Sequence, residues 1–367
     1  MTGGAGFIGS HLVDGLVRRG YRVRVLDYLE TQVHGKRPRW PAYRNRDAEY
    51  VRGDIRDGHA VARALRDVAV VFHKAAAVGV GQSMYQVEKY ISINSLGAGV
   101  VLEAILKRRA HIRKMIVASS MSIYGEGKYH CGVCGTFSPR LRPRAQLRQH
   151  RWEMRCANCN RVAIPKPTDE TKPLQPTSVY AVTKRDHEEL FLSIGRAYQI
   201  PTVALRYFNV FGPRQALSNP YTGVAAIFSS RILNQSPPLI FEDGKQSRDF
   251  IHVSDIVAAN LLALENSRAD YEVFNVGTGR GTSVLQVATT LSRLLGFRKP
   301  PVVLNEFREG DIRHCFADIK KISRALGYKP RVEFDEGMRE LVGWLCKQEA
   351  SDQVEKATKE LRKRGLI

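Results

Sequence analysis

The sequence predicts an α/β protein built on a doubly wound parallel sheet. Apolar runs typical of strands that are buried on both faces, such as "VAVVFHKAAA" and "KMIVASS", alternate along the chain with helical segments. A glycine-rich run, "TGGAGFIGSH", occupies residues 2–11 and leads into a helical pattern that stops at Gly20. In sheets of this kind, ligands bind at the carboxyl ends of the strands.

The chain has 367 residues and a hydrophobic fraction of 43%, values typical of a soluble globular protein. We expect no membrane contact, because no apolar run approaches roughly 20 residues. No signal peptide precedes the glycine run, so the predicted location is cytoplasmic. The formal net charge of +21 is compatible with nucleic acid, a membrane surface or polyanionic small molecules, and it does not choose among them.

The spacing of Gly3, Gly6 and Gly9 is typical of a loop that cradles a diphosphate, although three glycines alone can also mark an ordinary turn. The helix after the run and the strand pattern "YRVRVLD" behind it favour the phosphate loop. That strand ends at Asp27, close to the roughly 20-residue offset at which a carboxylate accepts hydrogen bonds from an adenosine ribose. A carboxylate there would repel a 2′-phosphate, so NAD is favoured over NADP.

The strand that normally leads into such a loop is not visible, because only Met1 precedes the run. The other strands of this half of the sheet are recognisable, and a sheet without its central strand would expose unpaired edges. We therefore expect the first strand to be missing from the recorded N-terminus through a misplaced start. A valine codon before Thr2 could have been read as an initiator, and a stop codon directly upstream would refute this hypothesis.

Three side chains form the candidate catalytic set. Tyr180 and Lys184 in "SVYAVTK" are spaced i, i+4 on one face of a helix, and Ser120 lies at the carboxyl end of the strand in "ASSMSIYG". A free phenol is a poor base with a pKa of about 10, but a nearby ammonium and a nicotinamide cation would lower that pKa. Tyr180 is the predicted general base, with Ser120 sharing a hydrogen bond to the reacting oxygen.

Many segments in this order resemble the extended short-chain dehydrogenase/reductase family, in its nucleotide-sugar epimerase/dehydratase branch. They include "TGGAGFIGSH", "GDIRD", "ASSMSIYG", "SVYAVTK", "LRYFNVFGPRQ", "RDFIHVSD" and "REGDIRHCFAD", and the match runs from Thr2 to about Trp344. The resemblance implies a Rossmann fold. It implies that NAD is bound by Gly3, Gly6, Phe7, Ile8, Gly9, Asp27, Asp54, Ile55, Ala75, Asn94, Tyr180 and Lys184. It also implies that a nucleotide sugar is bound by Ser120, Ser122, Asn209, Arg248, Arg308 and Asp311.

The residues after the catalytic serine narrow the reaction that the resemblance implies. Dehydratases of this family carry an Asp-Glu pair there, whereas this chain has Met121 and Ser122, which are neither strong acids nor strong bases. Decarboxylases place a glutamate at the position of Ser122. What remains is 4-epimerization through a transient 4-keto sugar, with NAD regenerated in each cycle.

Among epimerases, "AAAVGVGQSMYQ" and the presence of a cysteine-bearing insertion are most similar to bacterial dTDP-L-rhamnose 4-epimerases. UDP-glucose or UDP-glucuronate 4-epimerization is the nearest alternative. A 4,6-dehydratase or reductase of the same family is a more distant one.

The insertion lies between the serine strand and the tyrosine helix. Cys131, Cys134, Cys156 and Cys159 form two C-x2-C pairs separated by 21 residues, the pattern of a zinc ribbon with four thiolate ligands. Redox-active pairs and unrelated free thiols are the alternatives, and two matched pairs in a cytosolic protein favour zinc. We expect a closed structural zinc site without a catalytic role.

Arginines follow one another between the two cysteine pairs, at positions 140, 142, 144, 148, 151 and 155. Basic zinc ribbons can bind nucleic acid, so a second hypothesis from another class is a non-catalytic NAD-binding protein that binds nucleic acid through this insertion. The intact catalytic set and the scarcity of aromatic residues beside the arginines disfavour it. We favour instead an insertion that serves as a lid or a dimer-edge element close to the active site. The expected partners are a dTDP- or UDP-sugar and, by resemblance, a second copy of the chain in a homodimer.

The predicted organisation has a smaller C-terminal substrate domain beside the NAD-binding Rossmann core. The expected boundaries are 1–127 and 166–210 for the core with a return at about 250–277, 128–165 for the zinc ribbon, 211–249 and 278–347 for the substrate domain, and 348–367 for a C-terminal helix.

Overall fold

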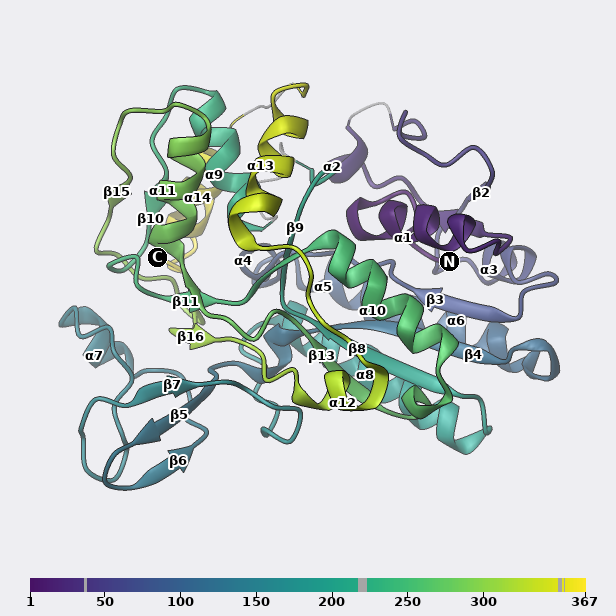
Figure 1. Cartoon of the computed structure of the whole chain (residues 1–367), viewed down its shortest axis with the longest axis horizontal. Helices are drawn as coiled ribbons and strands as arrows, with labels where there is room; N and C mark the ends of the chain where they lie inside the picture. Colours follow the sequence, from purple (N-terminus) through teal and green to yellow (C-terminus); the bar gives the residue numbers. More distant parts are fainter. Residues whose placement is uncertain (36–37, 217–222, 349–351, 353) are drawn as a thin grey trace.

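The computed structural model describes residues 1–35, 38–216, 223–348, 352 and 354–367, and a parallel sheet lies at its centre (Figure 1). All pairings in this sheet are parallel, which confirms the predicted fold class. The order across the sheet is β2 (Glu49–Arg52), β1 (Arg24–Asp27), the pair of residues at positions 1–2, β3 (Val70–His73), β4 (Lys114–Ser120), β8 (Thr202–Tyr207) and β13 (Val273–Val276).

Met1 and Thr2 take the central place in the sheet where a first strand is expected. The amide of Thr2 donates to the carbonyl of Phe72 in β3 at 3.0 Å, and the amide of Leu26 in β1 donates to the carbonyl of Met1 at 2.8 Å. These two residues therefore join the β1–β2 pair to the other four strands and hold the glycine loop at the carboxyl edge of the sheet.

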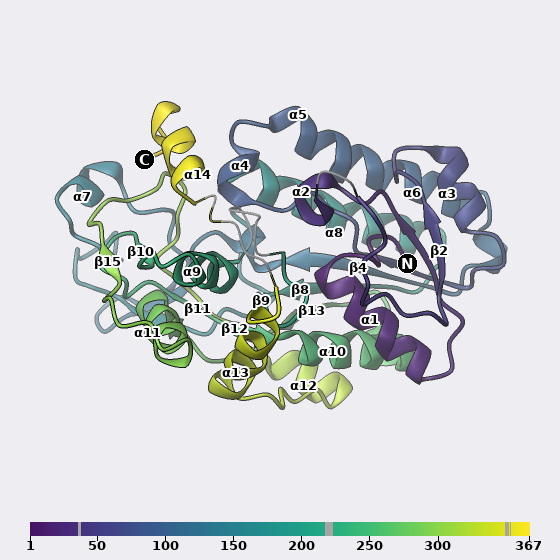
Figure 2. The same ribbon diagram turned by 90° about the horizontal axis from the view of Figure 1, so that it is seen from above.

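Helices cover both faces of the sheet, and Figure 2 shows the two layers. Leu26 of β1 faces a core that contains Val61, Val101 and Phe191 from the helices of one layer, whereas the neighbouring Val25 faces the opposite core. One layer consists of α3 (Gly58–Ala64), α6 (Gly97–Leu106) and α8 (Val179–Ala197), and the other of α1 (Phe7–Arg18) and α10 (Val253–Glu265). The alternating side chains of a strand explain why both layers are needed.

One helical stretch corrects the expectation about apolar runs. Val87–Leu106 is continuous through α5 (Val87–Tyr90), the π-helical η1 (Ile91–Leu96) and α6, and it is long and apolar enough to cross a membrane by length and composition. Nearly half of it is buried, and its α6 part packs against α3 and α8, as a core helix of a soluble protein does.

A second lobe lies beside the carboxyl edge of the sheet (Figure 1). Its core is formed by Phe211, Phe228, Leu291 and Leu341, among others. Its paired strands are β9 (Asn209–Phe211) with β12 (Phe250–His252), β10 (Leu239–Ile240) with β15 (Val302–Val303), and β11 (Ser247–Arg248) between β14 (Thr282–Ser283) and β16 (His314–Cys315). Its helices are α9 (Val224–Leu233), α11 (Val284–Leu294), α13 (Phe334–Leu345) and α14 (Val354–Lys363), while α12 (Lys320–Leu326) packs against β13 of the main sheet.

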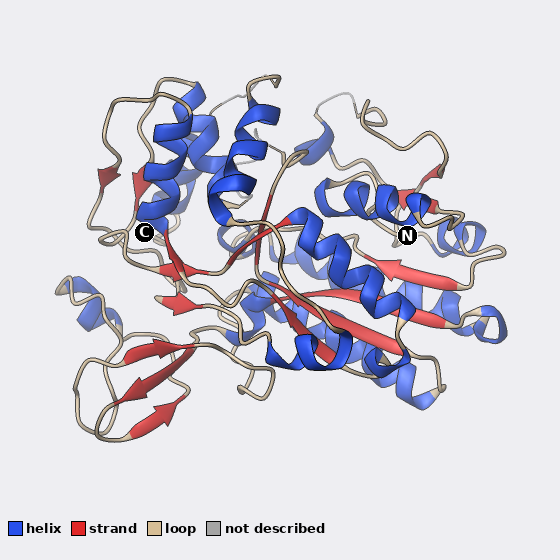
Figure 3. Ribbon diagram, in the orientation of Figure 1, coloured by secondary structure: helices blue, strands red, loops and turns tan. Residues whose placement is uncertain are grey.

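The cysteine-bearing insertion forms a small antiparallel sheet that projects from the body of the protein (Figure 3). β5 pairs with both β6 and β7, and the buried apolar cluster contains only Tyr129, Met154 and Ala163 among the described residues. The elements of the insertion are β5 (Lys128–Cys131), β6 (Gly135–Phe137), α7 (Arg144–Arg148) and β7 (Ile164–Lys166). So small a core needs an additional cross-link for stability.

The remaining elements are short helices on connections. They are α2 (Thr31–His34), α4 (Val80–Ser83), η2 (Arg109–His111), η3 (Met121–Tyr124) and η4 (Ser267–Ala269).

Candidate active site

The glycine loop turns tightly between the centre of the sheet and α1. Gly3 has φ +71°, and a Cβ there would lie 2.7 Å from the amide nitrogen of Ala75, while a Cβ on Gly9 would lie 2.1 Å from the carbonyl oxygen of Gly3. At Gly6, by contrast, a Cβ would meet only the Gly3 oxygen, at 3.6 Å. Two glycines are thus needed for close packing, and the third keeps the surface of the loop open.

The open surface leads to the N-terminus of α1, where the amides of Phe7 and Ile8 begin the helix. No described side chain caps this end, and its first turn carries no acidic residue. Free amides and the positive end of the helix dipole attract a diphosphate. The loop therefore fits the diphosphate of a dinucleotide.

Asp27 ends β1 beside this loop. Its carboxylate accepts hydrogen bonds from the amide of Ala5 at 3.0 Å and from the amide of Leu29 at 2.9 Å. These bonds fix the carboxylate at the edge of the loop, where it is half-buried and in reach of a ligand. The placement is the one expected for binding an adenosine ribose.

Asp54 and Ile55 follow β2 at the same edge of the sheet. Asp54 is half-buried and forms an ion pair with Arg56 at 2.6 Å, so its carboxylate already has a partner within the protein. Ile55 is buried against Gly97 of α6.

Asn94 lies in the π-helical segment η1. Its side chain is completely buried and bonds the amide and the carbonyl of Ala77 at 2.8 and 3.1 Å and the hydroxyl of Thr183 at 2.9 Å. Asn94 therefore ties the connection after β3, which begins near Ala75, to helix α8. It contributes to the predicted cofactor site by holding that connection and the tyrosine helix together.

The candidate catalytic residues come together from two elements. Ser120 ends β4, and its hydroxyl oxygen accepts hydrogen bonds from the Ser122 amide at 3.2 Å and from the Ser122 hydroxyl at 3.0 Å. The Ser120 hydroxyl also lies close enough to the phenol of Tyr180, on the first turn of α8, to act on its pKa. Ser119 points elsewhere, because its hydroxyl donates to Glu188 at 2.7 Å.

Burial controls the protonation of Tyr180 and Lys184. Burial raises the pKa of Tyr180 to about 12, and the nearby Ser120 hydroxyl acts in the opposite direction. The predicted lowering of this pKa depends on a nearby nicotinamide cation and stays a prediction; in the protein alone the loss of water outweighs the nearby groups. Burial also lowers the pKa of Lys184 to about 7.

The ammonium group of Lys184 is held in place by two acceptors. Its Nζ donates to the carbonyl of Ala118 at 2.7 Å and lies 3.3 Å from Nδ1 of His187. Nε2 of His187 lies 3.0 Å from the carbonyl of Asn94, to which only a protonated nitrogen can donate, so Nδ1 is free to accept. His187 is a positioning residue that the sequence analysis missed, although its i, i+3 spacing from Lys184 was a usable signal.

Asn209 and Arg248 lie on strands of the second lobe. Oδ1 of Asn209 is buried and has no hydrogen-bond partner among the described residues, the state expected of a group that binds a ligand. The guanidinium of Arg248 donates to the carbonyls of Ser247, Ile312 and Arg313 at 2.8, 2.7 and 3.0 Å. Arg248 is thus held firmly against the segment that leads into β16.

Arg308 and Asp311 lie on that same segment. They form an ion pair at 2.8 Å, and the guanidinium of Arg308 lies over the ring of Phe241 at 4.7 Å. Arg308 is partly exposed, so part of its donor set remains open for an anion. The six predicted substrate residues therefore come from β4, η3, β9, β11 and this segment.

The four cysteines of the insertion converge. Their sulfur atoms lie within 4.8 Å of one another, and Sγ of Cys131 lies 3.4 Å from Sγ of Cys159. Thiolates around a tetrahedral zinc ion are about 3.8 Å apart, since Zn–S distances are about 2.3 Å. Hydrogen bonds from the amides of Cys134 and then Val133 lower the pKa of Cys131 to about 6. The residues therefore fit a four-sulfur metal site.

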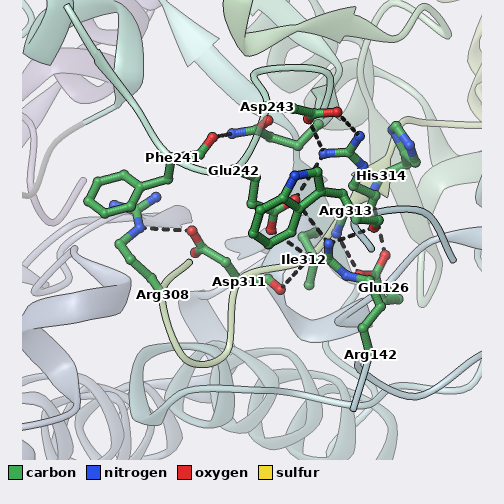
Figure 4. A network of polar contacts seen from close by, with 12 residues as sticks. Glu126, Arg142, Phe241, Glu242, Asp243, Arg308, Asp311, Ile312, Arg313 and His314 are labelled. Carbon is green, nitrogen blue, oxygen red and sulfur yellow. Dashed lines mark hydrogen bonds and ion pairs between the residues drawn. The ribbon is translucent and has the colours of Figure 1, made fainter. Parts of the chain in front are cut away.

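A buried ion network between the insertion and the second lobe was not foreseen (Figure 4). Arg142 and Arg313 are fully buried and bond to Glu242, which is buried as well. Arg142 belongs to the arginine run that suggested a nucleic-acid surface, and its burial removes it from any such surface. The sequence contained no pattern that predicts the burial of Arg142, because its partners are far away along the chain.

The comparisons with known proteins agree with this geometry. The model of the NAD dependent epimerase/dehydratase family matches residues 1–144 and 158–277. A dTDP-L-rhamnose 4-epimerase of Burkholderia thailandensis is 33% identical over 350 residues, covering 95% of this chain and 94% of that protein.

Two solved structures extend the comparison. A UDP-glucose 4-epimerase of Thermotoga maritima, with UDP-glucose, has a TM-score of 0.76 at 34% identity and covers 94% of this chain and 97% of its own. A UDP-glucuronic acid 4-epimerase of Bacillus cereus, in complex with UDP-glucuronic acid and NAD, has a TM-score of 0.77 at 27% identity. The match covers 94% of this chain and 98% of that one.

Proposed function

Because this chain belongs to the NAD dependent epimerase/dehydratase family, we propose that it is an enzyme that inverts the configuration at carbon 4 of a nucleotide sugar. The observation that carries the proposal is the contact of Tyr180 with Ser120 at the end of β4, beside the anchored Lys184. This arrangement can remove the proton of a sugar hydroxyl and later return it.

The residues of this chain have distinct roles in the proposed reaction. Bound NAD supplies a hydride acceptor that can give the hydride back. Tyr180 Oη takes the proton from the hydroxyl on carbon 4 of the sugar, and Ser120 donates a hydrogen bond to the same sugar oxygen as it becomes a carbonyl. In its protonated form, Lys184 favours the phenolate by its charge, and Ala118 and His187 keep its amine in place.

The second half of the reaction reverses the first on the other face of the sugar. The keto sugar turns over while its nucleotide diphosphate stays bound by Asn209, Arg248 and Arg308, which we place on the substrate side. Tyr180 then returns the proton. Met121 and Ser122 offer no strong acid or base, so water elimination from the keto sugar is disfavoured.

The proposed cofactor site uses the glycine loop and the carboxylate beside it. The amides at the start of α1 would hold the diphosphate of NAD, and Asp27 would accept from its adenosine ribose. Ala75, Asn94, Asp54 and Ile55 shape the wall of this site.

We favour dTDP-L-rhamnose as the substrate. The similarity to the Burkholderia thailandensis dTDP-L-rhamnose 4-epimerase extends over almost the whole of both chains. UDP-glucose and UDP-glucuronate remain the second choice, because 4-epimerases with those names are similar over almost as much of the chain.

Incubation of the purified protein with a panel of dTDP- and UDP-sugars, without added cofactor, tests this proposal. We expect NMR to show the 4-epimer of dTDP-L-rhamnose at a higher initial rate than that of any UDP-sugar. A Tyr180→Phe variant should form the epimer at least about a thousandfold more slowly. Formation of a dehydrated 4-keto-6-deoxy product instead would contradict the assigned reaction.

We propose that the four cysteines bind one structural zinc ion. The support is the convergence of their sulfur atoms in a module whose apolar core is too small to hold its own fold. Elemental analysis should find one zinc per chain, and Cys156→Ser should lose it, whereas the exposed Cys346→Ser should keep it. Zinc-free protein with all four thiols reactive and an intact insertion would contradict this assignment.

We also propose a homodimer formed through α8 and the helix beside it. Ser95 of η1 donates to Asp186 of α8 at 2.6 Å, which joins the two helices side by side. Around this contact, large apolar side chains are exposed, a pattern typical of an interface. They are Val87, Ile91, Leu96, Val182 and Leu190. Light scattering should give twice the chain mass, and Ile91→Asp should yield monomers.

A further inference from the structure

We propose that the cysteine-bearing insertion is a working part of the nucleotide-sugar site, and that its Arg142 is a positioning residue for the segment that carries Arg308 and Asp311. This inference rests on the proposed function. In this role the insertion sets the affinity of the site for the nucleotide diphosphate.

Arg142 leaves the insertion and enters the second lobe. Its guanidinium donates to both carboxylate oxygens of Glu242 at 2.9 and 2.8 Å, and to the carbonyl of Trp152 at 2.8 Å. It also donates to the carbonyl of Asp311 at 3.3 Å. The Arg142 side chain is 1% exposed, so these contacts are shielded from water and from salt.

A second contribution of the insertion is Glu153. Its carboxylate accepts from Arg313 at 2.6 Å and lies 3.3 Å from Nε2 of His314. Both Arg142 and Glu153 lie between the two cysteine pairs, so the convergence of the cysteines controls where these two side chains are placed.

The carboxylates of the second lobe complete the network shown in Figure 4. Arg313 donates to Glu242 at 2.9 Å and to Asp243 at 2.7 Å. The amide of Arg313 donates to Glu126, directly ahead of the insertion, at 2.5 Å. Two buried guanidinium groups are thus surrounded by carboxylates from both sides of the interface, an arrangement that is costly to take apart.

The network ends on the substrate site. Three successive carbonyls of one segment accept from arginines: Asp311 from Arg142, and Ile312 and Arg313 from Arg248. The insertion and the proposed diphosphate ligand Arg248 therefore bind the same stretch of backbone. Asp311 in turn orients Arg308, whose Nε donates to the Asp311 carboxylate at 2.8 Å. A shift of Arg142 would therefore move the segment that carries Arg308 and Asp311 and that holds Arg248.

Replacement of Arg142 by lysine tests the inference, because lysine keeps the charge but cannot make the forked contact with Glu242. The matched control is Arg140→Lys, two residues earlier on the exposed surface of the insertion. We expect Arg142→Lys to keep its NAD and zinc, to raise KM about tenfold and to leave kcat within about twofold. Calorimetric affinities for UDP and dTDP should fall by the same factor, while the control matches the wild type.

Unchanged KM and unchanged nucleotide affinity in Arg142→Lys would overturn the inference. If this variant does not fold, Glu153→Gln tests the inference instead, because the Glu153 side chain is partly exposed and tolerates the change. We expect a smaller rise of KM in Glu153→Gln. A wild-type KM and wild-type nucleotide affinity in this variant would overturn the inference. A wild-type protein that binds UDP or dTDP but turns over no sugar refutes the proposed function alone, and the nucleotide affinities of the variants still decide the role of Arg142.

Discussion

Replacing Arg206 with methionine should destabilise the protein strongly. Arg206 of β8 and Glu188 of α8 are almost fully buried, 5% and 4% exposed, and the guanidinium donates to Glu188 at 2.9 Å. The same carboxylate accepts a hydrogen bond from Ser119, which precedes the proposed catalytic residue Ser120. Without Arg206, Glu188 becomes a buried charge without a cation, which costs about 3–5 kcal/mol of unfolding free energy.

The matched control is Arg185→Met on α8, the helix that carries Glu188. Arg185 pairs with Glu189 at 2.7 Å, but the two side chains are 42% and 53% exposed, so this change should cost about 0–1 kcal/mol. Urea unfolding followed by tryptophan fluorescence measures both variants, and Arg206→Met with Glu188→Leu should recover most of the loss. Equal losses in the two single variants would refute the reasoning from burial.

Three further predictions concern the active site. Tyr180→Phe should reduce epimerization by at least about a thousandfold, because it removes the general base, while bound NAD measured by absorbance stays the same. Burial lowers the pKa of Lys184 to about 7, so above pH 7 this residue binds more protons in the unfolded chain than in the folded protein. The unfolding free energy of the wild type should therefore rise by about 2–3 kcal/mol from pH 7 to 9, relative to that of Lys184→Met. Asn209→Ala should raise KM about tenfold without lowering the unfolding temperature, because the buried Oδ1 loses no described protein partner.

Each of these has a result that would contradict it. Epimer formation by Tyr180→Phe at more than a tenth of the wild-type rate would remove the phenol from the mechanism. Parallel stability curves for the wild type and Lys184→Met would mean that Lys184 is not buried as a neutral amine. An unchanged KM with a lower unfolding temperature would make Asn209 a structural residue.

The parts of the site that sequence alone could predict are those encoded by local spacing. Close packing in the fold requires glycine at positions 3 and 9. Tyr180 and Lys184 lie on one face of the same helix, so their spacing in the sequence was enough to predict that they lie together. The rise in the pKa of Tyr180 that burial causes in the protein alone could not be predicted, because burial is a property of packing and no spacing reports it. The central place of Met1 and Thr2 in the sheet likewise needed the pairing itself.

By itself, the sequence determined the α/β class, the glycine loop, the pairing of tyrosine with lysine and the two matched cysteine pairs. Each of these depends on short, recognisable residue spacings or on a simple alternation of strand and helix. Only the tertiary structure decided that Arg142 is buried and that the insertion contacts the segment that carries Arg308 and Asp311. Its partners Glu242 and Asp311 lie 100 and 169 residues further along the chain, and contacts over such separations are set by the packing of the whole fold and leave no periodic trace in the sequence.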